Sequence, residues 1–201
     1  TCRRAATSYA ALAALGQQPA LQLHSFACSG ATVADVLNSA QKPNNGGPIA
    51  GWLPQLSNLT STAPVFMTPD DLGATRVVLV SVGGNDTGFS TIITACLLPS
   101  SCADDQPAWF AKAESLEPIF VQAYEKIDEA TGDATVVVVP YPQFVDVTDC
   151  GKAISLDEYQ FVVDFIEVLN NTIARAASAA GVLVADTRHT FDGHRQCDRE
   201  P

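Results

Sequence analysis

The chain has 201 residues, of which 47% are hydrophobic and 16% charged, and this composition is typical of a folded globular protein. Eleven basic and 22 acidic residues give a net charge of −11, which disfavours a nucleic-acid partner, because phosphate binding requires a basic stripe. The sequence holds no run of 18 apolar residues, so it predicts no transmembrane segment. We expect one domain over residues 1–201.

The cysteines indicate an oxidising compartment. There are six of them: Cys2, Cys28, Cys96, Cys102, Cys150 and Cys197. None forms a C-x-x-C pair and only three histidines are present, which disfavours a zinc site and favours three disulfides. We therefore predict a secreted protein whose leader lies outside this sequence. Three Asn-x-Thr sequons, at Asn58, Asn85 and Asn170, weakly favour a glycoprotein.

The first part of the chain predicts two helices around a strand. Alanine-rich Arg4–Leu15 is expected to be helical and to end at Gly16, a residue suited to a helix C-cap. Leu21–Ala27 is expected to be a buried strand. A Ser-Gly turn then leads into a helix over Thr32–Ala40, and residues 41–48, rich in Pro, Asn and Gly, form a loop.

The rest of the chain predicts three more strands and two long helices. Arg76–Val82 and Ala134–Pro140 are continuous β-branched runs, which are typical of strands in a parallel sheet covered on both faces. Gly181–Ala185 is the last strand. Pro107–Ala130 and Leu156–Ala180 have the spacing of long amphipathic helices.

This alternation of helices and strands predicts a three-layer α/β fold with right-handed crossovers. Ligands in such folds bind beyond the carboxyl ends of the strands. The loops that follow Ala27, Val82, Pro140 and Ala185 are therefore the places to look for chemistry.

Two of these loops carry glycines beside polar groups. The loop after Val82 reads GGNDTG, with Asn85 at its centre. An asparagine amide on a tight turn is a neutral donor that stabilises an oxyanion, or else Asn and Asp merely cap their own turn. In the loop after Ala27, the N–H of Gly30 is a second candidate oxyanion donor. The alternative there is a plain helix cap by Ser29 or Thr32.

The last loop contains two candidate general bases, His189 and His194. Histidine suits this role because imidazole gains and loses its proton near neutral pH. His194 follows Gly193 and precedes Cys197, whose disulfide would fix its position, whereas His189 has more polar neighbours. This context favours His194.

Together the three loops resemble those of the SGNH (GDSL-type) hydrolases, in particular the secreted branch with three disulfides. The motif CSGAT matches the second family block at Gly30, VSVGGNDTGF matches the third at Asn85, and FDGHRQC matches the last at His194. The resemblance covers nearly the whole chain. It implies a serine ester hydrolase without a cofactor, in which His194 is the base and Gly30 and Asn85 form the oxyanion hole.

The resemblance leaves the third member of the triad open. Asp192 is the nearest carboxylate to His194, and Asp186 stands three residues before His189, the spacing common in the family. The backbone carbonyl of Phe191 is a further candidate for orienting the His194 ring. The resemblance also implies the disulfides Cys2–Cys28, Cys96–Cys102 and Cys150–Cys197.

The nucleophile is absent from this sequence, because no Gly-Asp-Ser block occurs in it. In the family that block ends the first strand, which is internal in a flavodoxin-like sheet of order 2-1-3-4-5. We therefore expect a three-layer α/β/α sandwich whose first strand is missing from this chain. That strand and its serine would lie on a separate piece of polypeptide, either a cleaved N-terminal fragment or residues left out of this sequence. Direct pairing of Leu21–Ala27 with Arg76–Val82 would refute this.

The resemblance implies an ester of a small molecule, lipid or glycan as the substrate. Phe89, Trp109 and Phe110 are candidates for an apolar acyl site, although such side chains more often belong to the core. The alternative function is a catalytically inactive, hydrolase-like module that binds a glycan, lipid or ester.

Overall fold

The computed structural model describes residues 6–17, 19–39, 54–57, 73–96, 102–147, 154–196 and 198. Its centre is a parallel sheet in the order β1-β2-β3, formed by β1 (Val77–Val80), β2 (Thr135–Val138) and β3 (Leu183–Val184). The predicted α/β class with a parallel sheet is therefore confirmed.

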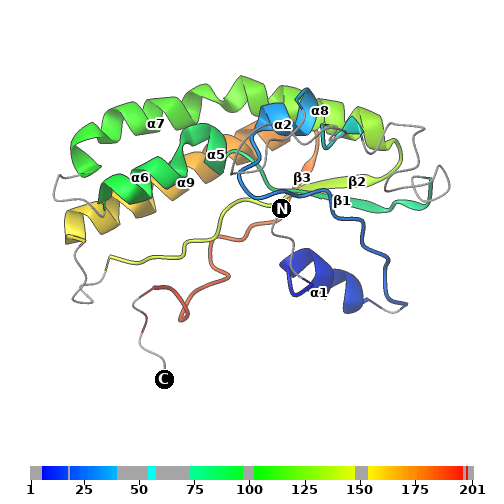
Figure 1. Cartoon of the computed structure of the whole chain (residues 1–201), viewed down its shortest axis with the longest axis horizontal. Helices are drawn as coiled ribbons and strands as arrows, with labels where there is room; N and C mark the ends of the chain where they lie inside the picture. The colour runs from blue at the N-terminus through cyan, green and yellow to red at the C-terminus, as the bar shows by residue number, and fades with distance from the viewer. Residues whose placement is uncertain are drawn as a thin grey trace.

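Helices gather on one side of this sheet. Figure 1 shows α7, α8 and α9 above the three strands and α1 below them. Their bounds are α1 Tyr9–Leu15, α2 Val33–Leu37, α5 Gly84–Thr87, α6 Phe89–Cys96, α7 Gln106–Ser115, α8 Glu117–Thr131 and α9 Leu156–Ala179, with a 3₁₀ turn, η1, at Cys102–Asp105. In folds of this kind, ligands bind in the loops beyond the carboxyl ends of the strands.

The main core lies between the sheet and α8 and α9. Val80, Val136 and Val138 are buried on the covered face, whereas Val77 and Leu79 on the opposite face of β1 are 47% and 39% exposed. On α9 the side chains that recur every four residues are buried, as their spacing predicted; they are Phe161, Phe165, Leu169 and Ile173. Burial of this apolar stripe is what fixes a helix of 24 residues against the sheet.

Two helices begin with a reciprocal capping box. In α2 the Thr32 hydroxyl accepts from the Asp35 backbone N–H, and the Asp35 carboxylate accepts from the Thr32 backbone N–H. In α9 Ser155 and Glu158 repeat the arrangement. These bonds satisfy donors that a helix start leaves unpaired. The cap predicted for Thr32 is thus present, although α2 ends at Leu37 rather than at Ala40.

The prediction of one helix over Pro107–Ala130 is wrong, because the structure has two. The break falls at Leu116, just before Pro118 at the start of α8. Proline lacks the N–H that a continuous helix needs and clashes with the preceding turn. For α1, Ser8 caps the start and Gly16 the end, as predicted for Gly16.

The prediction of a strand over Leu21–Ala27 is also wrong. The segment is extended but belongs to no ladder, and Leu21 and Leu23 are 48% and 40% exposed. Within the described residues β1 is an edge strand, paired with β2 on one side only. A strand requires ladder hydrogen bonds along its length, and an apolar pattern alone does not provide them.

One of the implied disulfides is confirmed. Cys96 at the end of α6 is bonded to Cys102 at the start of η1. Cys28 is disulfide-bonded as well. Cys2, Cys150 and Cys197 lie outside the described residues, as does the predicted loop at 41–48, so those predictions stay untested.

A buried carboxylate supports the start of α9. Glu158 is 7% exposed and accepts hydrogen bonds from the Ser155 backbone, the Ser155 hydroxyl and the Cys102 backbone N–H. The Ser155 backbone bond, above all, holds the pKa of Glu158 below its ordinary value.

We therefore expect Glu158→Gln to lower the thermal midpoint at pH 7 by about 2–6 °C. A carboxyl whose pKa is lowered by folding stabilises the protein above its unfolded pKa, and loses that effect as the pH falls through the folded value. The difference in thermal midpoint between wild type and variant should therefore shrink as the pH falls. Scanning calorimetry from pH 7 to pH 3 measures this difference, and a difference that grows at low pH would contradict the stabilising role of the Glu158 carboxylate.

Candidate active site at the carboxyl ends of the strands

The loops that carry Gly30 and Asn85 meet in space. The Asn85 side-chain amide donates to the Ala31 carbonyl at 2.8 Å, and the Asp86 carboxylate accepts from the Val33 backbone N–H at 3.0 Å. Gly30 has φ 84°, a conformation that favours glycine. The structure thus brings together two of the predicted site residues, which are 55 positions apart in the sequence.

The Asn85 amide retains capacity for a ligand. A primary amide has two N–H donors, and one of them is used by Ala31. Asn85 itself is exposed, while Gly84 before it and Thr87 after it are buried. This half-buried turn is the geometry in which a fixed neutral donor stabilises a developing negative charge.

Asp86 is the tie between the two loops. Its carboxylate lies at the start of α2, where unpaired N–H groups favour an acceptor. Burial nevertheless raises the pKa of Asp86 above its ordinary value, and the Val33 hydrogen bond opposes that shift. The Asp86 carboxylate thus links the Asn85 turn to the start of α2.

Tyr141 supports the Asn85 turn from the loop after β2. The Gly84 backbone N–H donates to the Tyr141 hydroxyl at 2.9 Å, and Asn170 of α9 bonds the Tyr141 backbone N–H and carbonyl at 3.0 and 2.7 Å. Burial raises the pKa of Tyr141, so the phenol stays neutral. The turn also requires glycine at position 83. Its φ is 121°, and a Cβ there would lie 2.6 Å from the Phe120 ring.

These contacts decide two of the three sequons. Asn170 is 3% exposed and both its amide atoms are used by Tyr141, so it is not a glycan acceptor in the folded protein. The Asn85 amide bonds Ala31 and its sequon partner Thr87 is fully buried. Asn58 lies outside the described residues, and its glycosylation remains a prediction.

The histidine loop is fastened to the same segment as Tyr141. The Thr187 hydroxyl donates to the Pro140 carbonyl at 2.7 Å, the Gln143 N–H to the Arg188 carbonyl at 3.1 Å, and the Gln196 N–H to the Phe144 carbonyl at 2.8 Å. Segment 140–144 therefore supports both the Asn85 turn and the histidine loop. This is the connection between the two halves of the candidate site.

Within that loop the two histidines differ. His194 is exposed, and its backbone N–H donates to the Phe191 carbonyl at 2.8 Å. His189 has a 77% exposed side chain, and its Nδ1 lies 3.2 Å from the Asp192 carboxylate. Asp192 also pairs with Arg195. The carboxylate proposed for His194 is thus held by His189 and Arg195 in this structure.

The other carboxylate candidate has a partner too. Asp186 pairs with Arg188 at 2.7 Å, which lowers the pKa of Asp186 to about 2. Arg188 also reaches Glu167 of α9 at 3.1 Å. These ion pairs order the loop between β3 and His194, and they leave Asp186 directed at Arg188 rather than at a histidine.

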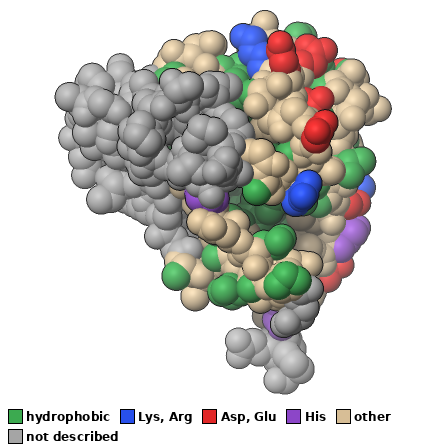
Figure 2. Space-filling view, turned by 90° about the vertical axis from the view of Figure 1, so that its right-hand side faces the viewer, with side chains coloured by type: hydrophobic (Ala, Val, Ile, Leu, Met, Phe, Trp, Pro, Cys, Tyr) green, Lys and Arg blue, Asp and Glu red, His purple; other side chains and the backbone are tan. Residues whose placement is uncertain are grey.

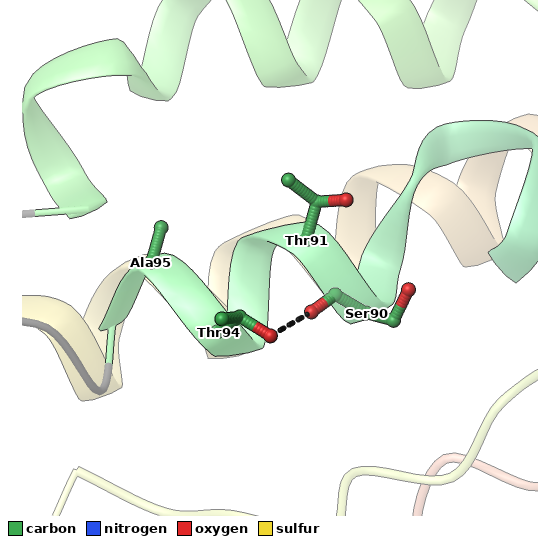
Figure 3. Close-up of a pocket in the computed structure, with 4 residues that line it drawn as sticks. All are labelled: Ser90, Thr91, Thr94 and Ala95. Carbon is green, nitrogen blue, oxygen red and sulfur yellow. Dashed lines mark hydrogen bonds between the residues drawn. The ribbon is translucent and has the colours of Figure 1, made fainter.

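Two hollows lie near α6. The larger, of about 300 Å³, runs along its outer face beside Ser90, Thr91, Thr94 and Ala95 (Figure 3). There the Thr94 hydroxyl donates to the Ser90 carbonyl of its own helix, and this local bond disfavours a role as a nucleophile. The smaller, of about 60 Å³, adjoins Gly84 and is lined by apolar atoms.

The three aromatic candidates for an acyl site have different surroundings. Phe89 borders the small cavity. Phe110 packs on Phe161 with ring centroids 6.0 Å apart, and Trp109 carries Lys112 over its ring at 5.5 Å. The last two have structural roles.

The surface is acidic and apolar in separate regions. Figure 2 shows hydrophobic side chains gathered in the lower part of one face and acidic side chains in the upper part. In the described part of the chain, no group of three His, Cys, Asp or Glu is arranged to hold a metal ion. None of the described helices is long and apolar enough to cross a membrane.

Sequence reasoning did not identify Tyr141, Asn170 or the Asp86–Val33 tie. Tyr141 directly follows the predicted strand Ala134–Pro140, three residues after the end of β2, and this position near a strand end was a usable signal. Asn170 lies on the buried face of α9, where a polar side chain needs a partner. The Asp86 contact joins residues 53 positions apart and had no local signal.

Comparison with known proteins identifies the family of this chain. The GDSL-like lipase/acylhydrolase family matches residues 1–201. Lipase 1 of Streptomyces coelicolor is 28% identical over 203 residues, and the lipase of Streptomyces rimosus is 29% identical over 209. Both matches cover 100% of this chain, but 65% and 66% of those proteins. The chain thus spans just under two thirds of the length of these relatives.

Two solved structures are also similar. Phospholipase A1 from Streptomyces albidoflavus NA297 has a TM-score of 0.74 and 27% identity, with 99% of this chain and 74% of that chain covered. The extracellular lipase from Streptomyces rimosus has a TM-score of 0.76 and 28% identity, with 100% and 75% covered. Both are similar to this chain over nearly all of its length.

Proposed function

Because the chain belongs to the GDSL-like lipase/acylhydrolase family, we propose that it carries most of the active site of a secreted carboxylic ester hydrolase. Its serine nucleophile lies outside these 201 residues. The observation that supports this most is the contact between the Gly30 and Asn85 loops, in which the Asn85 amide donates to the carbonyl of Ala31, the residue after Gly30.

The proposed reaction has two steps. The serine oxygen attacks the ester carbonyl carbon while His194 takes the serine proton, and the carbonyl oxygen becomes an oxyanion held by the Gly30 N–H and the Asn85 amide. His194 then gives the proton to the leaving alcohol as the ester bond breaks, which leaves an acyl-serine. Water, deprotonated by His194, releases the acid and restores the serine.

We place the serine on a strand that pairs with the open edge of β1. Two features support this position: β1 has a ladder partner on one side only among the described residues, and Leu21–Ala27 is extended with exposed leucines. A parallel strand inserted there would end at the same edge of the sheet as the Asn85 turn. We propose that the occupant is an N-terminal segment that ends in Gly-Asp-Ser, either a cleaved fragment or residues of the same polypeptide outside these 201.

Secretion is supported by the Cys96–Cys102 disulfide and by the relatives, since one solved relative is an extracellular lipase. The substrate class, an ester of a lipid or small molecule, rests on the relatives that are lipases or a phospholipase. No cofactor takes part in the proposed steps.

The test is complementation by a peptide. A β-branched peptide of about six to eight residues that ends in Gly-Asp-Ser is mixed with the chain, and hydrolysis of p-nitrophenyl butyrate is followed. We expect activity only from the mixture, and none when the peptide ends in Gly-Asp-Ala. Binding of the peptide without hydrolysis would instead indicate an inactive binding module.

We assign the third triad position to Asp192, two residues before His194. Once a substrate is present, this carboxylate would stabilise the charged imidazolium. In the complemented enzyme, Asp192→Asn is expected to lower kcat by about 10²-fold or more, whereas Asp186→Asn should leave kcat within about threefold. Steady-state kinetics of these two variants tests the assignment of the third triad position. A loss of less than about threefold for Asp192→Asn would assign the orienting role to the Phe191 carbonyl.

A further inference from the structure

The small cavity beside Gly84 has no role in the reaction proposed above. It lies between the Asn85 turn, the loop after β2, and α9. Its walls are formed by Gly84, Phe89, Tyr141, Phe144, Ile166 and Leu169. Gly84 directly precedes Asn85, so the cavity begins one residue from a proposed oxyanion donor.

The chemistry of these walls selects an apolar occupant. The lining atoms are almost all apolar. The hydroxyl of Tyr141 is taken by the Gly84 N–H at 2.9 Å, and burial keeps that phenol neutral by raising the pKa of Tyr141. An occupant with a charge or an unpaired polar group would lose its hydration there without a replacement.

The walls are also held in place. The Phe89 ring meets Phe144 edge-on with centroids 5.9 Å apart, and it stacks on Phe165 at 6.0 Å. Ile166 and Leu169 are each 2% exposed on α9. Closely packed walls of this kind keep the volume of a cavity nearly constant.

Size then limits the occupant. The cavity measures about 60 Å³. An apolar cavity of about 150 Å³ holds the six carbons of benzene, so about 60 Å³ accommodates about two or three carbons. A long fatty acyl chain does not fit without displacing Phe89 or Phe144.

We propose that this cavity receives the acyl chain of the substrate and makes the site selective for esters of short acids, from acetate to about butyrate. The inference rests on the proposed hydrolase function. With the carbonyl oxygen at Gly30 and Asn85, the acyl chain passes along Gly84 into the cavity, and the alcohol part of the ester stays outside.

The first experiment is a chain-length series on the complemented enzyme, with p-nitrophenyl acetate, butyrate, octanoate and dodecanoate. Each methylene buried in the cavity should raise kcat/KM about fourfold. We therefore expect kcat/KM to rise about 16-fold from acetate to butyrate, and to be lower for octanoate than for butyrate. A rise that continues to dodecanoate would overturn the proposal while leaving the hydrolase function intact.

Variants of the cavity wall should move this optimum. Phe144→Ala enlarges the cavity and is expected to shift the best substrate to a longer acyl chain, and Phe144→Leu should do so to a smaller extent if the alanine variant does not fold. Phe110→Ala is the matched control, because Phe110 packs on Phe161 and does not line the cavity. An equal shift in the control would overturn the proposal.

A binding measurement separates this proposal from the hydrolase function. Ethyl butyrate and ethyl octanoate are titrated into the chain without peptide, and the methyl signals of Ile166 and Leu169 are followed by NMR. We expect shifts with ethyl butyrate and none with ethyl octanoate. If these shifts occur but the mixture of chain and peptide hydrolyses no ester, the cavity proposal stands and the hydrolase function is rejected. If ethyl butyrate causes no shift, the cavity proposal is rejected.

Discussion

Replacing His194 with alanine is expected to lower kcat/KM of the complemented enzyme by about 10²-fold to 10⁴-fold, because the reaction loses the group that moves the serine proton. His194 is exposed in a loop that is tied by three hydrogen bonds to segment 140–144. Its removal should therefore change the chemistry and not the fold. Ester hydrolysis and the thermal midpoint are measured together.

His189→Ala is the matched control for this experiment. His189 lies in the same loop, is 77% exposed, and contacts Asp192 at 3.2 Å, so a histidine–carboxylate pair exists there as well. We expect His189→Ala to retain activity within about threefold of wild type, as for most exposed side chains. If the large loss fell on His189 instead, the base would be His189, paired with Asp192.

Asn85→Ala is expected to lower kcat by about 10²-fold to 10³-fold, with little change in KM, because the amide bonds the oxyanion more strongly than the ground-state carbonyl. The same substitution also removes the 2.8 Å bond to Ala31, which is worth about 1 kcal/mol of stability. The split between kcat and KM distinguishes the catalytic effect from the structural one.

Asn38→Ala provides the comparison for Asn85→Ala. Asn38 is an exposed asparagine at the end of α2, away from the Asn85 turn in sequence. Its replacement should leave kcat unchanged within about twofold. An Asn85→Ala variant that loses only stability, with kcat at the wild-type value, would remove Asn85 from the oxyanion hole.

The sequence predicted the parts of the fold that local patterns determine. The four-residue recurrence of Phe161, Phe165, Leu169 and Ile173 predicted α9, and β-branched runs predicted β1 and β2. The segment Leu21–Ala27 is not a strand in the structure, because its apolar pattern carries no information about ladder pairing, which depends on the tertiary fold. The break before Pro118 was a local signal that the amphipathic spacing obscured.

The sequence predicted individual residues of the candidate site but not the contacts between them. Motifs predicted Gly30, Asn85 and His194 as site residues. The contacts that arrange their loops join residues far apart in the sequence, such as Asp86 to Val33 and Tyr141 to Gly84. Such pairs depend on the tertiary fold and leave no periodicity to detect. The pairing of Asp192 with His189 is local, yet motif spacing pointed to other partners for both residues.

Labelling with a fluorophosphonate tests most directly whether this chain completes an active site around a serine outside it. The chain is mixed with the Gly-Asp-Ser peptide, treated with the probe, and examined by mass spectrometry, alongside the His194→Ala variant and the Gly-Asp-Ala peptide. We predict a label on the peptide serine that requires the chain and its His194. A label on Ser29 or another serine of the chain, or no label on a bound peptide, would contradict the account.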